Sequence, residues 1–416
     1  MTINRRQFLT GVLGGSAAAG LVHFSGMSSL LSMAEASAST VPKNGPFVLV
    51  TLTGGNDGLN TVIPYSSGTY YDWRGELAIP ADQVLHLGSD GAHEFGFHPS
   101  LTSLQALWKE GKVAIISGVE YPDPNFSHFQ SSYIWQTAQL SGDPSTGWLG
   151  RWLDATGSDP FRALSIGPNL PPVLVGAKQQ ACSLVDSTSP GDQLPGQNPQ
   201  FSAAYRQLMS TFPGELGIQA EQATSGKNLL TVGSKAAAAL SHERTEAATS
   251  GRNAGDIGNQ LDIVADLIRY GLPTSVYSVD WGGFDTHSAQ ADNHAGLLSS
   301  LDAAIEGFMS VFPTAVPGRS PVVVIYSEFG RTTRVNASAG TDHSSASVVL
   351  VVGPGVKGGF YGATPSFTHL DPYGNLIYTT DFRKVYATVL ERVLGMESPG
   401  YVLGGSYKPI DFLRAV

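Results

Sequence analysis

The sequence predicts an α/β fold with a mostly parallel central sheet and helices on both of its faces. Short β-branched, apolar runs bounded by Gly, Pro or Asp alternate along the chain with segments whose apolar positions recur three and four residues apart. Strands of a parallel sheet appear as continuous apolar runs because helices cover both faces. The 416 residues are 42% hydrophobic and 14% charged, which is typical of a globular protein.

The pattern places the elements as follows. Buried strands are predicted at 47–53, 113–117, 275–280, 322–327 and 347–352. Helices are predicted at 101–109, 129–139, 256–270, 291–312 and 381–394. Between residues 160 and 253 the pattern loosens, which predicts a variable insertion of loops and surface helices that caps one end of the sheet. We therefore expect a single domain over residues 39–416.

The first 38 residues have the pattern of an export leader. Arg5 and Arg6 precede a mildly apolar, Gly- and Ala-rich stretch, and residues 36–38 (ASA) resemble a cleavage site. This predicts a signal peptide over residues 1–38 that the twin-arginine export machinery recognises. The alternative is a short membrane anchor, which His23 and the glycines disfavour because they interrupt the run of about 20 apolar residues that a span needs. We expect a periplasmic or extracellular protein with no stable membrane span after cleavage.

The net charge and the cysteine content limit what this protein can bind and how it can be stabilised. The formal charge of −10 at pH 7 argues against binding nucleic acid through its phosphates. The single cysteine, Cys182, cannot form an intrachain disulfide. An exported chain without disulfides depends on its core or on a bound metal for stability.

Polar residues gather where the predicted strands meet loops. The carboxyl ends of parallel strands share one edge of the sheet, and ligands of α/β proteins bind there. Although charged residues are scarce, five loops carry them, together with imidazoles and a serine: Asp57; Ser127 and His128; Asp285, His287, Asp292 and His294; Glu328 and Arg331; Asp342 and His343. This clustering predicts a functional site at that edge.

The residue types indicate metal chemistry. Asp and His are ligands of zinc and similar divalent ions, and Asp285, His287 and His343 would form a three-ligand site with an open position. Asp57 and Glu328 would hold a second, harder ion such as magnesium, calcium or manganese. Two ions about 4 Å apart stabilise both oxygens of a displacement at phosphorus, and by extension at sulfur.

A serine at a predicted helix start is the candidate nucleophile. Ser127 would face backbone N–H groups and the positive end of the helix dipole, which suit an anionic ester. A serine hydroxyl is weak until its proton is removed, and His128 or an ion held by Asp57 would remove it. Arg331 would bind the ester oxygens through its guanidinium group.

Structural interpretations compete with these roles. Ser127 could simply cap its helix. Asp57 could brace the Gly-rich turn around it. Asp285 and His287 could belong to a structural hydrogen-bond cluster.

The remaining polar residues also have alternatives. Glu328 and Arg331 could form a local ion pair. His294 is more typical of a helix-surface histidine than of a ligand. Asp342 could be a ligand, a turn residue, or the group that orients the His343 imidazole.

Six motifs carry a family resemblance. In chain order they are GGNDGLNTVIPY, NFSHFQSSYIWQTA, GGFDTHSAQ, SEFGRT, GTDHSSA and DFRKVYATVLERVLG. Together they resemble the DUF1501 family of exported bacterial proteins across nearly the whole mature chain. That family is placed in the alkaline phosphatase-like superfamily with the sulfatases and metal-dependent phosphoglycerate mutases. The resemblance implies an alkaline phosphatase-like α/β fold.

The resemblance also implies roles for individual residues. Asp57 is similar to the superfamily's first-strand metal ligand, and Ser127 falls where a nucleophilic Ser or Thr opens a helix. Asp285 and His287 resemble ligands of the first metal, although the superfamily usually spaces them wider. His343 resembles the last histidine of that site.

One position departs from the superfamily pattern. Glu328 lies where an Asp-His pair usually binds the second metal, and Phe329 replaces the histidine. The second site therefore lacks a nitrogen ligand, and the resemblance implies a weaker or oxygen-preferring ion there, or none.

These observations predict an exported metal-dependent hydrolase of phosphate or sulfate esters, with zinc as the first ion and Ser127 as nucleophile. The substrate would be a small anionic ester or a cell-envelope component. The alternative is a non-catalytic exported binding protein on a degenerate scaffold, which Phe329 favours. A purely structural scaffold is disfavoured because unpartnered buried charges are costly.

Overall fold

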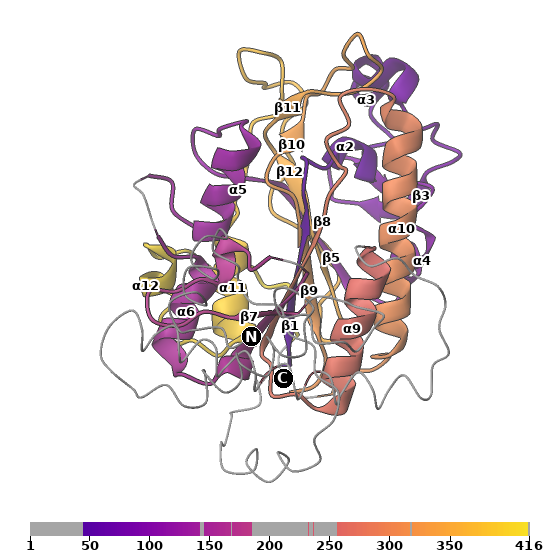
Figure 1. The fold of residues 1–416 in the computed structure, drawn as a ribbon. Helices are drawn as coiled ribbons and strands as arrows, with labels where there is room; N and C mark the ends of the chain where they lie inside the picture. Colours follow the sequence, from indigo (N-terminus) through magenta and orange to yellow (C-terminus); the bar gives the residue numbers. More distant parts are fainter. Residues whose placement is uncertain are drawn as a thin grey trace, which may run out of the picture.

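A nine-stranded sheet forms the middle layer of the protein (Figure 1). The computed structural model describes residues 45–141, 145–167, 169–184, 256–316 and 318–414, together with Val232 and Ala236. Within them the strand order is β13 (Gly359–Tyr361), β5 (Val113–Glu120), β12 (Ser347–Val352), β9 (Val322–Tyr326), β1 (Phe47–Leu52), β8 (Val276–Trp281), β6 (Ala163–Ile166) and β7 (Cys182–Leu184). The ninth strand, β14 (Thr380–Asp381), also pairs with β5.

The sheet is mostly parallel, which confirms the predicted fold class. Of its described strands, only β12 runs against the others, antiparallel to both β5 and β9. Because β12 is reversed, the residues before it lie at the edge where the residues after β1, β8 and β9 lie. His343, which precedes β12, thereby joins the edge where Asp57 and Asp285 follow their strands.

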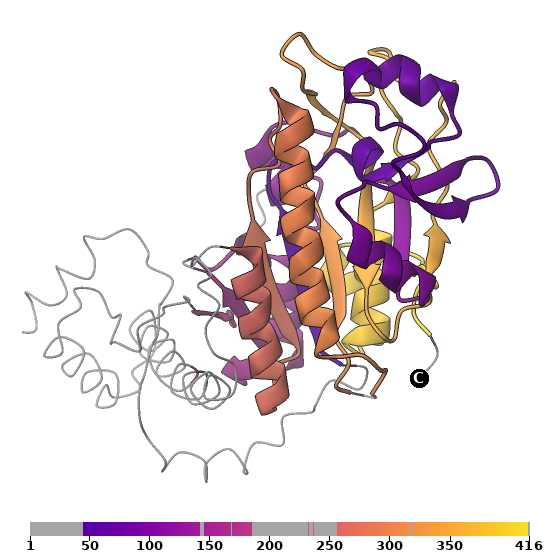
Figure 2. The same ribbon diagram turned by 90° about the vertical axis from the view of Figure 1, so that its right-hand side faces the viewer.

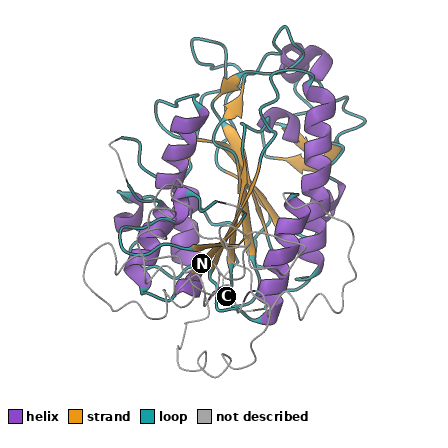
Figure 3. Ribbon diagram, in the orientation of Figure 1, coloured by secondary structure: helices purple, strands orange, loops and turns teal. Residues whose placement is uncertain are grey.

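The buried strands explain the continuous apolar runs. Along β1, Val48 and Val50 belong to the hydrophobic core on one face, and Phe47 and Leu49 to the core on the other. Successive side chains of a strand point to opposite faces, so both sets must be apolar when helices cover both faces. Figure 3 shows the sheet between its two helical layers.

Helices on the two faces form separate layers (Figure 1). One layer contains α5 (His128–Thr137), α6 (Trp148–Thr156), α11 (Arg383–Thr388) with the π-helix Val389–Val393, and α12 (Gly400–Leu403). The other contains α4 (Thr102–Lys109), α9 (Ile257–Tyr270) and α10 (Gln290–Ser310), and α9 packs along α10 (Figure 2). The predicted helices agree with these bounds to within two residues.

Local signals explain where the helices begin and end. The Asp256 carboxylate accepts a hydrogen bond from the Gly258 N–H and caps the start of α9. Gly271 ends that helix in the left-handed region, at φ +85°, where a residue without a Cβ carries no steric penalty.

Smaller elements surround the site edge and were not predicted, because they are short. A three-stranded sheet contains β2 (Val62–Ile63), β4 (Glu94–Phe97) and β3 (Leu85–Ser89), and a hairpin contains β10 (Gly330–Arg331) and β11 (His343–Ser344). Short helices are α2 (Gly58–Thr61), α3 (Gly68–Arg74) and the 3-10 turns Gly75–Leu77, Pro160–Arg162 and Pro172–Leu174. No helix in the described part of the chain is long and apolar enough to cross a membrane.

The segment expected as an insertion begins inside the sheet. Its first part supplies β6 and β7, which extend the sheet beside β8. Apart from Val232 and Ala236, residues 185–255 lie outside the described residues, and so does the predicted leader. The cap and the signal peptide therefore stay predictions.

Candidate metal centre

A cluster of potential metal ligands lies at the carboxyl edge of the sheet. His128 at the start of α5, Asp285 after β8 and His343 in β11 bring ligand atoms within 4.8 Å of one another. His287 adjoins them, since its Nε2 lies 2.9 Å from His343 Nε2 and 3.0 Å from Asp285 Oδ1. The fold thus brings three sequence-predicted ligands together and adds His128, which we had expected to act as a base.

Hydrogen bonds on the far side of each ring determine which nitrogen is free. His343 Nδ1 lies 2.8 Å from the Phe126 carbonyl oxygen. A carbonyl only accepts hydrogen bonds, so Nδ1 carries the proton and a neutral His343 has its lone pair on Nε2.

The other two imidazoles have the same arrangement. His287 Nδ1 lies 2.8 Å from Asp342 Oδ1, and hydrogen bonds from His287 and Asn336 lower the pKa of Asp342, so this partner is an ionised acceptor. His128 Nδ1 lies 2.8 Å from Glu328 Oε1. Carboxylates on Nδ1 leave the Nε2 lone pairs of His287 and His128 free, as in histidines that bind metals.

The three free nitrogens converge on one carboxylate. His287 Nε2 and His343 Nε2 each lie 3.0 Å from Asp285 Oδ1, and His128 Nε2 lies 3.4 Å from Asp285 Oδ2. Lone pairs that face each other repel unless a cation, either a proton or a metal ion, lies among them. Imidazole nitrogens and a carboxylate oxygen form the donor set typical of zinc, so these residues fit a divalent metal.

Asp285 is held in its ionised form. Burial raises its pKa, but the hydrogen bond from Arg331, 2.7 Å away, and the positive charge of its guanidinium hold the pKa well below its ordinary value. Its side chain is about half exposed, so the centre of the cluster is open to solvent.

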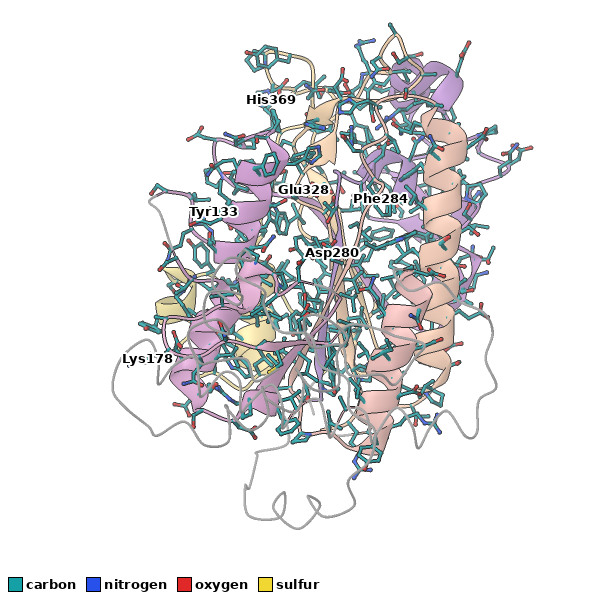
Figure 4. The ribbon with its side chains drawn as sticks, in the orientation of Figure 1. Tyr133, Lys178, Asp280, Phe284, Glu328 and His369 are labelled. Carbon is teal, nitrogen blue, oxygen red and sulfur yellow. The ribbon has the colours of Figure 1, made fainter. Side chains whose placement is uncertain are left out.

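Glu328 contacts the cluster only through His128, at the ring nitrogen that points away from Asp285. Figure 4 shows it near the end of the sheet, between the α5 and α10 layers. Its carboxylate is buried and accepts hydrogen bonds from the Gly54 and Gly55 N–H groups and from the Ser327 hydroxyl, besides facing His128. The structure therefore places Glu328 as the group that orients His128, not as a ligand of a second ion.

The structure does not place Arg331 as an anion-binding residue. Its side chain is fully buried, Nε donates to the Gly55 carbonyl at 2.6 Å, and Nη1 donates to the Thr341 carbonyl at 2.8 Å. Nη2 is shared among the Gly54 and Phe284 carbonyls and Asp285. Because every guanidinium nitrogen is engaged by the protein, Arg331 positions Asp285 and joins three loops.

Asp57 lies in a buried ion pair with Arg74. Arg74 donates to both carboxylate oxygens, at 2.7 and 2.9 Å, and both side chains are fully buried. The Asn60 N–H and the Gln290 amide also donate to the carboxylate. Four donors occupy the four lone-pair directions of a carboxylate. This arrangement contradicts the expectation that Asp57 binds a second ion, and no second group of potential ligands occurs among the described residues.

Ser127 begins α5 beside the cluster. Its backbone lies between Phe126, whose carbonyl contacts His343, and His128, whose ring contacts Asp285. Its side chain is exposed and makes no capping hydrogen bond to the helix. The interpretation of Ser127 as a side-chain cap is therefore wrong.

Phe329 lies where the superfamily pattern has a histidine. Its buried ring packs 4.4 Å from the His343 ring and 4.9 Å from the His128 ring, measured between centroids. A Cβ on Gly55 would lie 2.4 Å from a Phe329 ring carbon, and Gly55 has φ +79°, so both the contact and the backbone require glycine. The phenyl ring holds the two imidazoles in place and offers no ligand atom.

The prediction about one histidine outside the cluster was wrong. His294 is buried, with its Nε2 3.0 Å from Asn56 Oδ1, and is not on the surface. His98 is also buried, and its ring packs edge-on against the His294 ring with the centroids 5.9 Å apart. Asp292, on the first turn of α10, is exposed.

Sequence reasoning missed the groups that orient the ligands. Asp342 lies beside His343 in the sequence, but in the folded hairpin it orients His287. The Phe126 carbonyl carried no sequence signal, because every residue has a backbone carbonyl. The Arg74 guanidinium, which pairs with Asp57, lies in none of the six motifs.

Comparison with known families identifies the chain. The family described as "Protein of unknown function (DUF1501)" matches residues 46–392. The chain belongs to the DUF1501 family. No curated protein sequence matches this DUF1501 chain.

Several solved structures are distantly similar to this DUF1501 protein. The C-terminal periplasmic domain of EptC from Escherichia coli, in complex with zinc, has 10% identity and a TM-score of 0.34 over 76% of this chain and 74% of that one. The lipoteichoic acid synthase LtaP from Listeria monocytogenes has 7% identity and a TM-score of 0.38 over 88% and 76%. The sulfatase PsFucS1 from Pseudoalteromonas sp. has 12% identity and a TM-score of 0.37 over 88% and 71%. At this level of similarity, nothing about the activity of this chain follows.

Proposed function

We propose that this protein is an exported hydrolase of phosphate or sulfate esters that works with one divalent metal ion, most simply zinc. The observation that carries the proposal is the convergence of three Nε2 lone pairs on the ionised Asp285 carboxylate, at a solvent-open edge of the sheet. A metal in such a position polarises an ester oxygen and lowers the pKa of a hydroxyl beside it.

In this proposal the ligands are His128, Asp285, His287 and His343. Glu328 and Asp342 each accept a hydrogen bond from an imidazole Nδ1, which directs the Nε2 of His128 and of His287 inward as the ligand atom. This replaces the expected role of His128 as a base, since its free nitrogen faces Asp285.

Ser127 is the proposed nucleophile. Its exposed hydroxyl stands at the N-terminus of a ten-residue helix, where free backbone N–H groups favour an anionic ester. Attack by Oγ would form a seryl phosphate or sulfate and break the bond to the alcohol, which leaves with the proton of the serine hydroxyl. Water would then cleave the seryl ester, restore the hydroxyl and release phosphate or sulfate.

Metal content tests the centre directly. We expect the purified protein to hold about one divalent ion per chain, and the Asp285→Ala/His343→Ala variant to hold none. Elemental analysis by mass spectrometry after dialysis measures this. Asp82→Ala/His86→Ala, a matched double change on the surface, should keep the metal. Equal metal content in all three proteins would rule out this centre.

Turnover tests the nucleophile. Ser127→Ala should lower kcat on phosphate or sulfate esters by a factor on the order of 10³ or more, while metal content and the circular dichroism spectrum stay the same. The control is Ser127→Thr, which keeps a hydroxyl and should retain part of the activity. A change at Ser131 on the same helix is less suitable, because that side chain is buried. Unchanged turnover in Ser127→Ala would show that a different group attacks.

The second candidate is a non-catalytic exported binding protein. The engagement of Arg331 by carbonyl groups favours it, because no guanidinium is left in the cluster to neutralise an ester anion. Metal-dependent ligand binding without turnover of any phosphate or sulfate ester would support this candidate over the hydrolase.

Export by the twin-arginine route is also proposed, from Arg5 and Arg6. Fractionation of cells that express Arg5→Lys/Arg6→Lys tests it, since the variant should remain in the cytoplasm with its leader attached.

A further inference from the structure

Two phenylalanines at the rim of the metal centre are exposed. Phe126 is 37% exposed and Phe129 is 91% exposed, and they flank Ser127 and His128. Phe126 belongs to the centre, because its carbonyl contacts His343 and its ring packs edge-on against Phe329 at 6.5 Å. The Phe129 ring lies almost wholly in water and the Phe126 ring partly so, and these exposed surfaces are available to a ligand.

A polar groove begins on the other side of Asp285. It has a volume of about 550 Å³ and lies between the loop after β8 and the first turns of α10. Its lining is mainly hydroxyl, amide and carboxylate groups, from residues that include Thr286, Ser288, Asp292, Asn293 and Ser300. Thr286 Oγ1 is buried and has no hydrogen-bond partner within the described protein. The lining, as described, includes no Lys or Arg.

The two surfaces lie on opposite faces of the sheet. The aromatic pair is at the start of α5, and the groove runs along α10, which belongs to the other helical layer (Figure 1). Asp285 connects them, since it contacts His128 of α5 and also lines the groove. A ligand that uses both surfaces therefore extends in two directions from the metal ligands.

The chemistry of the two surfaces selects one class of ligand. An exposed phenyl ring stacks against a flat, weakly polar face, while the groove offers hydrogen bonds to neutral hydroxyl groups. A lipid chain would not use the groove. A nucleotide would bring further phosphates to a groove that offers two carboxylates and no cation. A sugar has both an apolar C–H face and a hydroxyl-rich edge.

We propose that the ester hydrolysed by this protein is carried on an oligosaccharide. One sugar ring stacks on Phe126 and Phe129, and a neighbouring sugar places its hydroxyls in the groove beside Asp292 and Asn293. The inference rests on the proposed function for the position of the ester, and it names the substrate class.

Binding measurements with the metal-loaded Ser127→Ala protein test the proposal without consuming the ligand. The probes are sulfate and phosphate monoesters of oligosaccharides of glucose, galactose, mannose and N-acetylglucosamine, with methyl sulfate and methyl phosphate as esters that lack a ring. We expect at least one oligosaccharide ester to bind at least about tenfold more tightly than its methyl counterpart in titration calorimetry.

Substitutions then locate the sugar. Phe126→Ala/Phe129→Ala should remove that tenfold preference, and Phe126→Trp/Phe129→Trp should keep it. Asn293→Ala should weaken the oligosaccharide and leave the methyl ester unchanged. Tyr401→Ala changes an aromatic that is 71% exposed on α12, away from the centre, and should have no effect.

The outcomes separate this inference from the proposed hydrolase. If no oligosaccharide ester binds better than a methyl ester, or if Tyr401→Ala has the same effect as the phenylalanine pair, the carbohydrate inference is wrong. Binding of phosphatidylglycerol vesicles that depends on the two phenylalanines would overturn it in favour of a lipid. Phenylalanine-dependent sugar binding without turnover in the wild-type protein would retain the inference and reject the hydrolase.

Discussion

At the residue scale, the main result is that acids of one type have different roles according to their partners. Asp285 faces three imidazole nitrogens and solvent, whereas Asp57 is enclosed by Arg74, Gln290 and a backbone N–H. Both follow a strand and both lie near glycines in the sequence. The sequence therefore predicted a ligand at each, and only the position of Arg74, on a helix that was not predicted, separates them.

The difference between the two acids can be measured. Asp57→Asn leaves the Arg74 guanidinium buried without its counter-charge, which should lower the free energy of unfolding by about 3–5 kcal/mol. Metal content should not change. Urea denaturation of the metal-free protein measures the free energy of unfolding. The control is Asp72→Asn, at an exposed acid on α3, the helix that carries Arg74. A variant that loses its metal but keeps its stability would restore Asp57 as a ligand.

At the element scale, the sequence predicted the long elements well and the short ones poorly. The five predicted strands and five predicted helices all occur, because each buries enough apolar surface to show a clear pattern. The hairpin of β10 and β11 has two residues per strand, and its pairing of Arg331 with His343 is set by tertiary contacts. The pattern of 347–352 predicted a strand but not its direction. Its reversal puts His343 at the site edge. The sequence proposed this ligand from its residue type and its place beside a strand, but it did not predict the reversal that brings it there.

The site was predicted less completely than the fold, because tertiary contacts decide the roles of its side chains. Asp285, His287 and His343 lie in compact motifs, and the fold brings them together. Arg331 and Glu328 lie in an equally clear motif, but their roles depend on which backbone groups of the first strand turn reach them. Spacing alone cannot tell whether a charged side chain in such a loop binds an ion or pairs with other groups of the protein, because burial decides which partners it meets.

At the scale of the whole molecule, two buried histidines should make stability depend on pH. Burial lowers the pKa of His294 and that of His98, in each case to about 4. In the unfolded chain both rings titrate near 6.5, so between about pH 6.5 and 4 the unfolded state binds more protons than the folded one. Their contribution to stability is present above pH 6.5 and is lost as the pH falls through this window.

Other buried or hydrogen-bonded groups also make the free energy of unfolding depend on pH. Hydrogen bonds lower the pKa of Asp90, Asp285 and Asp342, so these acids reduce stability only at more acidic pH. Burial raises the pKa of Glu120 well above its ordinary value, so Glu120 acts in the opposite direction and favours the folded state as the pH falls. The total slope is therefore a balance, and the contribution of one histidine must be taken as a difference between variant and wild type.

Replacing His294 isolates its contribution. In His294→Gln the side-chain amide can still donate to Asn56, but it cannot titrate. We expect the slope of unfolding free energy against pH to fall by about 1 kcal/mol per pH unit between pH 4.5 and 6, the amount for nearly one proton. Urea denaturation of metal-free protein at several pH values measures this slope, and the metal-site histidines contribute equally to both proteins. His86→Gln, at an exposed ring, is the control for exchanging a histidine for glutamine. If His294→Gln keeps the wild-type slope, His294 takes up its proton at the same pH in the folded and unfolded states, and its packing against His98 must tolerate a charge.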